Sequence, residues 1–108
     1  MKNITAGELS QWLGDPGRPR PVLLDVREPW EFGTCHIEGS KLVPMREIPQ
    51  RAEEIGKPDE DLVVICHHGS RSMQVALFLE RKGYAKVHNL AGGVDAWAKT
   101  VDPKMPKY

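Results

Sequence analysis

Short apolar runs alternate with longer stretches of mixed polarity along the chain. The runs at 22–26 (VLLDV) and 61–65 (DLVVI) consist almost entirely of apolar side chains, which is typical of buried strands. Two weaker runs, at 41–43 and 86–90, predict two more strands. From this pattern we expect four strands, two of them buried.

Helical patterns lie between these runs. Thr5 and Glu8 have the spacing of a capping box, which predicts a short helix through Leu13. Pro29 suits the first turn of another short helix at 27–32. Strands that alternate with helices over the whole chain predict an α/β fold with a mostly parallel sheet. Three further amphipathic stretches predict helices. One covers 46–55, one follows the 66–72 loop and ends at about Lys82, and one covers 94–99.

Size and composition limit what the chain can be. Its 108 residues fit a single domain over 1–108, with a core at about 3–100 and a tail at 101–108. Fifteen basic residues balance fifteen acidic ones, so no overall charge would attract nucleic acid or an anionic membrane surface. No run has the length of a membrane span or the pattern of a signal peptide, and we expect a cytoplasmic protein.

Two cysteines, Cys35 and Cys66, are the strongest candidates for chemistry. They form neither a CxxC pair nor a larger framework, so structural zinc and a disulfide scaffold are not expected. Cys66 follows the strand predicted at 61–65, at the edge where open parallel sheets bind ligands. The next loop leads into a helix N-terminus, whose unpaired amides and dipole would stabilise a thiolate. Gly69 would let successive amides turn toward the sulfur.

The side chains near Cys66 have competing interpretations. Hydrogen-bond donors or positive charge at the rim of the Cys66 loop would come from His67, His68 and Arg71. One of the two loop serines, Ser70 or Ser72, could cap the helix. Adjacent histidines on a tight loop rarely bind one ion, so we expect no metal. Alternatively, Cys66 is a small buried residue with no chemistry. The candidate site comprises Cys66, His67, His68, Gly69, Ser70, Arg71 and Ser72.

Other polar and aromatic residues are expected to be structural. Asp25 and Arg27 should form an ion pair or hydrogen bonds behind the loop, and His36 should be a loop histidine rather than a base. Aromatic side chains contribute the largest buried areas in a small domain. We therefore expect a place in the core or in a pocket wall for Trp12, Trp30, Phe32 and Trp97.

The motif CHHGSRS at 66–72 resembles the active-site loop of rhodanese-like sulfurtransferases. Other segments agree with the same family in order and spacing. LDVREPWEF at 24–32 and HIEGS at 36–40 are similar to its first signature region, and NLAGGVDAW at 89–97 is similar to its second. The resemblance spans about 3–100 of this chain.

The resemblance implies a fold and a reaction. The fold is a three-layer α/β/α domain around a five-stranded, mainly parallel sheet. Cys66 would take a sulfane sulfur from a small anionic donor such as thiosulfate, or from a persulfide, and pass it to cyanide or a thiol acceptor. The backbone of His67 to Ser72 would bind the transferred sulfur, with Arg71 steering anionic donors. Neither a metal nor an organic cofactor is implied, and a protein sulfur acceptor is one conceivable partner.

Loop length separates two chemistries that this fold supports. Related phosphatases and arsenate reductases carry five residues between the cysteine and the arginine, whereas four residues separate Cys66 from Arg71 here. The shorter ring of amides suits a sulfur atom rather than a tetrahedral oxyanion. Sulfur transfer is therefore favoured over phosphoryl transfer.

Beside the disfavoured phosphatase or arsenate reductase, one alternative function stays open. The protein could be a sulfur carrier or interaction module that hands a persulfide to one partner and uses thiosulfate poorly. The chain also departs from the family pattern, because Cys35 and Glu38 replace a common glycine and a common proline. Cys35 could resolve a persulfide or pair with Cys66 on oxidation.

Overall fold

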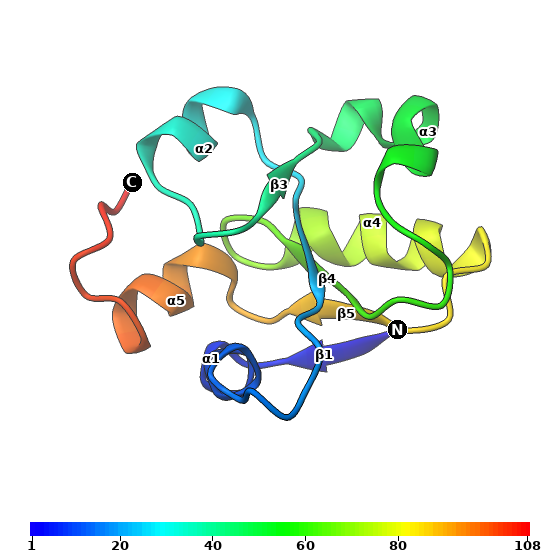
Figure 1. The fold of residues 1–108 in the computed structure, drawn as a ribbon. Coiled ribbons are helices and arrows are strands. Elements are labelled where there is room, and N and C mark those ends of the chain that lie inside the picture. Colours follow the sequence, from blue (N-terminus) through cyan, green and yellow to red (C-terminus); the bar gives the residue numbers. More distant parts are fainter.

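Five parallel strands form one sheet in the computed structural model, which describes residues 1–108 (Figure 1). The strand order is β1-β5-β4-β2-β3, and each neighbouring pair is parallel. The strands are β1 (Lys2–Ile4), β2 (Val22–Asp25), β3 (Lys41–Leu42), β4 (Leu62–Ile65) and β5 (Val87–Leu90). The helices are α1 (Ala6–Leu13), α2 (Pro29–Thr34), α3 (Ile48–Arg51), α4 (Ser70–Arg81) and α5 (Gly93–Thr100). The α/β fold and the five-stranded parallel sheet are thereby confirmed.

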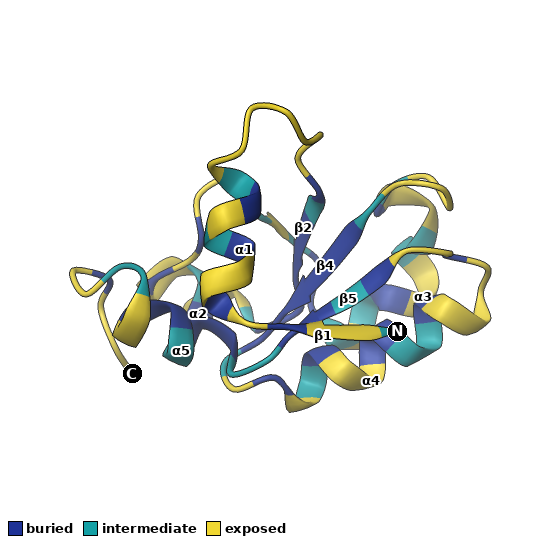
Figure 2. Cartoon of the chain, turned by 90° about the horizontal axis from the view of Figure 1, so that it is seen from below, coloured by how far each residue is buried: buried dark blue, intermediate teal, exposed yellow.

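Two apolar clusters cover the two faces of the sheet. Successive strand residues point to opposite faces, so Leu23 and Val63 join a cluster with α1 and α5, while Leu24 and Val64 join one with α3 and α4. β4 is buried along its whole length, whereas β1 at the edge is mostly exposed (Figure 2). This three-layer arrangement places the carboxyl ends of the strands at one edge.

Local sequence signals account for several element ends. The Thr5 side chain accepts from the Glu8 amide and the Glu8 side chain accepts from the Thr5 amide, so the predicted capping box is confirmed. Pro29 begins α2 as expected. None of the helices has both the length and the hydropathy needed to cross a bilayer.

Two segments differ from the sequence prediction. Lys2–Ile4 forms the fifth strand, although two of its three residues are exposed and no apolar run marks it. The single helix predicted at 46–55 is wrong: the four-residue α3 is flanked by 3-10 turns at Met45–Glu47 and Ala52–Glu54. Pro49 has no amide hydrogen to donate to a preceding turn, which favours this interruption.

Candidate active site

Cys66 lies directly after β4, with its side chain buried at 1% exposure. Its sulfur accepts a hydrogen bond from the Gly69 amide at 3.0 Å, and Gly69 has a φ of +107° as the loop turns into α4. The first amides of an α-helix have no partner within the helix, and this holds for those of Ser70 to Ser72 in α4. The buried sulfur therefore lies at the positive end of a twelve-residue helix.

Ser72 connects the sulfur to a buried amide. Its Oγ lies 3.2 Å from the Cys66 sulfur and donates to Asn89 Oδ1. Asn89 Nδ2 donates to the Gly69 carbonyl at 3.2 Å and to Asn3 Oδ1 at 2.9 Å. Because a carbonyl oxygen only accepts, Gly69 fixes the orientation of the Asn89 amide. The predicted serine cap is wrong, since Gly69 is the N-cap of α4 and no side chain caps it.

The start of α5 clamps the active-site loop from the other side. The Val94 amide donates to the Cys66 carbonyl at 2.9 Å, and the Asp95 amide donates to the His67 carbonyl at 3.0 Å. Gly93 has a φ of +58°, and a Cβ built on it would lie 2.3 Å from the Cys66 carbonyl oxygen. Only glycine permits this approach. The Gly92–Gly93 turn thus fixes the backbone that carries the sulfur.

Asp25 and Arg27 form a buried ion pair beneath α2, as expected. Both side chains are 0% exposed, and the guanidinium donates to both carboxylate oxygens, the shortest contact being 2.7 Å. Arg27 Nη2 also donates to the Cys35 carbonyl at 2.7 Å. Burial opposes the charge on Arg27, but hydrogen bonds with Asp25 and Tyr108 outweigh it and raise the pKa of this guanidinium. The pair holds the 27–35 segment against the sheet.

Arg71 is bound to Glu31 of α2, a partner that the sequence did not predict. The guanidinium donates to the two carboxylate oxygens at 2.7 and 2.9 Å, and the Glu31 side chain is only 5% exposed. These hydrogen bonds are the main cause that lowers the pKa of Glu31 to about 2. The pair is therefore fully ionised near neutral pH, and Arg71 presents no unpaired charge at the rim.

The tail at 101–108 returns across this edge of the molecule, where the C-terminus lies beside α2 and α5 (Figure 1). The Tyr108 hydroxyl accepts from Arg27 Nη1 and donates to Glu31 Oε2, both at 2.8 Å. Its ring stacks on His67 with centroids 4.1 Å apart. Burial is the main cause that raises the pKa of Tyr108 to about 12. The tail therefore covers part of the loop, with a space of only about 10 Å³, roughly one water, left beneath it.

The predicted places of the aromatic residues are only partly correct. Trp12 and Trp97 are buried at 5% and 8% exposure, which confirms them as core residues. Trp30 is 64% exposed, so its assignment to the core is wrong. It packs edge-on against Tyr108, at 5.5 Å between centroids, because α2 turns this side chain outward toward the tail. His36 binds the Phe32 carbonyl through Nδ1, as expected of a loop histidine.

Three side chains near the loop could hold a metal ion. One ligand atom each from His67, His68 and Asp95 lies within 4.8 Å of the others. However, the two imidazoles are stacked at 3.9 Å, so their in-plane lone pairs do not converge, and Asp95 is bound to Lys99 at 3.0 Å. That the reaction needs no metal stays a prediction.

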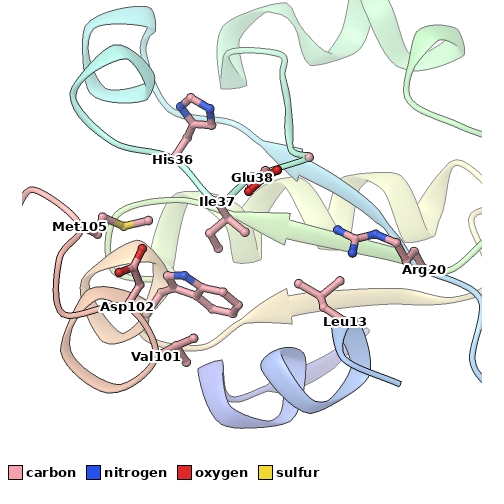
Figure 3. A pocket seen from close by; sticks show the side chains of 10 residues that line it. Leu13, Arg20, His36, Ile37, Glu38, Val101, Asp102 and Met105 are labelled. Carbon is pink, nitrogen blue, oxygen red and sulfur yellow. The ribbon is translucent and has the colours of Figure 1, made fainter. Parts of the chain in front are cut away.

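A separate cavity of about 640 Å³ opens between the ends of α1 and α5 and the turn after α2 (Figure 3). Ile37, Trp97 and Met105 are its buried apolar residues, and Arg20 and Glu38 bring charges of both signs. None of the residues from 66 to 72 lines it. This cavity is therefore distinct from the active-site loop.

Comparison with known proteins agrees with this geometry. A model of the Rhodanese-like domain matches residues 5–100. The chain belongs to the rhodanese-like domain family. A protein of Allochromatium vinosum named Sulfurtransferase is 39% identical over 99 residues, covering 92% of this chain and 90% of that protein. The crystal structure of a rhodanese-like domain protein from Staphylococcus aureus superposes with a TM-score of 0.82 at 33% identity, covering 90% of this chain and 91% of the other.

Some relatives of this rhodanese-like domain are much longer. The Arabidopsis thaliana protein named Rhodanese-like/PpiC domain-containing protein 12, chloroplastic, is 38% identical over 112 residues. These residues cover 100% of this chain but 38% of that protein. The chain spans still less, 26%, of a Mycobacterium tuberculosis relative. The match over 5–100 and the Allochromatium vinosum relative show that the chain belongs to the rhodanese-like sulfurtransferase family, and it spans only part of these longer members.

Proposed function

We propose that this protein is a sulfurtransferase in which Cys66 carries the transferred sulfur as a persulfide. The observation that carries this proposal is the buried Cys66 sulfur, which accepts from the Gly69 amide at the N-terminus of α4. Such a site stabilises negative charge on sulfur both before and after the transfer. The four-residue spacing between Cys66 and Arg71 supports sulfur rather than phosphate as the bound group.

The reaction has two balanced steps. The Cys66 thiolate attacks the outer sulfur of thiosulfate or of a persulfide, a new S–S bond forms, and the old S–S bond breaks as sulfite or a thiolate leaves with the electron pair. An acceptor nucleophile, cyanide or a thiol, then attacks the outer sulfur and restores the thiolate. The backbone from His67 to Ser72 binds the transferred sulfur. The reaction uses a reduced thiol, which fits the expected cytoplasmic location.

Thiocyanate formation, measured beside the intact mass of protein loaded with a sulfur donor, tests this function. We expect turnover and a gain of one sulfur atom, both lost in Cys66→Ser and both retained in Cys35→Ser, the matched control. Retained loading in Cys66→Ser would overturn the proposal. A gain of sulfur without turnover to cyanide or thiols would instead identify a sulfur carrier. If neither signal appears, hydrolysis of an aryl phosphate tests the phosphatase alternative.

A further inference from the structure

Three basic side chains around the active-site loop have their charges cancelled by ion pairs, whereas Lys107 of the tail, which lines the small cavity beside His67, has no ion pair. Arg71 is bound to Glu31, Lys99 to Asp95, and the deeper Arg27 to Asp25. Burial lowers the pKa of His67, so this imidazole is neutral near pH 7. The loop therefore lacks an unpaired cation at the position where the sequence predicts one. A doubly charged donor gains little attraction from such a rim.

The carboxylate of Glu31 is held so firmly that Arg71 cannot readily leave it. Each oxygen accepts two hydrogen bonds. Oε1 accepts from Arg71 and from the Glu28 amide at 3.0 Å, and Oε2 accepts from Arg71 and from the Tyr108 hydroxyl. A donor that recruited Arg71 would leave a nearly buried carboxylate without its counter-ion, which is strongly unfavourable. The Arg71 charge is thus withheld from substrates.

We propose that Glu31, held by Tyr108, determines donor specificity by cancelling the charge of Arg71, so that the site favours persulfides of small thiols over thiosulfate. Thiosulfate is a dianion and releases sulfite, and both species need a nearby cation. The persulfide group carries at most one negative charge, and its transfer releases a thiolate: R–S–SH and the Cys66 thiolate give Cys66–S–SH and R–S⁻. The inference rests on the function proposed above and names its preferred substrate class.

The decisive measurement is the ratio of kcat/KM for thiosulfate to kcat/KM for the persulfide of 2-mercaptoethanol, in which the persulfide is the only ionisable group. In Glu31→Gln the freed Arg71 charge should raise this ratio on the order of tenfold, and salt should then reduce the thiosulfate rate. Glu28→Gln is the matched control, because Glu28 is the N-cap of the same helix and its side chain is paired with Arg46 instead. Its ratio should equal that of the unaltered protein.

The double variant Glu31→Gln/Arg71→Met separates charge from structure. It replaces the ion pair with two neutral side chains, so the donor ratio should return to the unaltered value. Tyr108→Phe keeps the pair but removes one of its hydrogen bonds, and should raise the ratio less than Glu31→Gln does. This variant also keeps the inference testable if Glu31→Gln is poorly folded.

The outcomes of the two proposals are distinct. An unchanged ratio in Glu31→Gln, with its persulfide rate retained, would overturn the specificity role of Glu31 and leave sulfur transfer intact. A ratio that stays high in the double variant would overturn it too, because the gain would not come from Arg71. Absence of sulfur on Cys66 with either donor, read by intact mass in the unaltered protein, would instead refute the proposed function itself.

Discussion

Replacing Gly93 by alanine should push α5 away from the active-site loop. The new Cβ would lie 2.3 Å from the Cys66 carbonyl oxygen and 2.4 Å from that of His67, well under the 3.0 Å that real Cβ atoms keep. Relief requires a shift of about 1 Å, since both contacts are with backbone. That shift would stretch the hydrogen bonds from the Val94 and Asp95 amides, now 2.9 and 3.0 Å, beyond useful length.

The free-energy cost follows from these contacts. Holding alanine at the left-handed φ of Gly93 costs about 1 kcal/mol. Two weakened backbone hydrogen bonds add about 2 kcal/mol. A total of about 3 kcal/mol is a large part of the 5–15 kcal/mol, roughly, that stabilises a typical domain. The loop carrying Cys66 should also lose its fixed backbone, so sulfur loading should fall together with the free energy of unfolding.

Urea unfolding of three glycine variants distinguishes strain from the clash. Gly83→Ala imposes alanine on a φ of +105° with nothing within 4 Å of the new Cβ, so it should cost only about 1 kcal/mol. Gly33→Ala adds a methyl in open space on helix α2, and should be neutral or stabilising by up to about 1 kcal/mol. If Gly93→Ala falls within about 0.5 kcal/mol of Gly83→Ala, the clash with the active-site loop is not real.

Two further expectations concern buried charges. Because the pKa of Glu31 is lowered to about 2 from an ordinary 4.5, its stabilising effect is complete above about pH 5 and is lost as the pH falls toward 2. Acid titration of the unfolding free energy should therefore show a loss of up to about 3 kcal/mol that Glu31→Gln lacks; equal acid sensitivity in both proteins would contradict it. Arg27→Met should cost about 3–5 kcal/mol by leaving Asp25 buried without a partner, and Asp25→Asn/Arg27→Met should recover part of this in thermal unfolding. No recovery in the double variant would show that packing rather than charge is responsible.

Much of the sheet was predictable because its central strands are recognisable as apolar runs in the sequence. Val22–Asp25 and Leu62–Ile65 are nearly all apolar since both of their faces are covered. Lys2–Ile4 was not predicted, because an edge strand with one buried side chain owes its structure to pairing with β5. The interrupted helix at 46–55 kept helical spacing of its buried side chains, so periodicity alone could not reveal the breaks at its ends.

The candidate site was predictable only for residues that are close together in the sequence. Cys66 and its loop follow from the end of a strand and the start of a helix. The partner of Arg71 is forty residues away along the chain, and Tyr108 lies seventy-seven residues from Glu31. No sequence spacing encodes such contacts, which depend on how α2 and the tail cross the sheet edge. Asn89 lay inside a recognised motif, but its hydrogen bond to Ser72 becomes visible only when β5 lies beside β4.

In this all-parallel sheet, the site around Cys66 is complete only after the last strand pairing has formed. Pairing of β1 with β5 brings Lys2 beside His88, so this contact closes nearly the whole chain into one loop. Large loops are entropically the most expensive to close, and such a contact forms late. Asn3 on that strand also accepts one of the two hydrogen bonds that the Asn89 side chain donates. During refolding, protection of the β1 amides from hydrogen exchange and the ability of Cys66 to accept sulfur should therefore appear together. Transient detachment of this short strand should abolish sulfur loading while the other four strands stay paired.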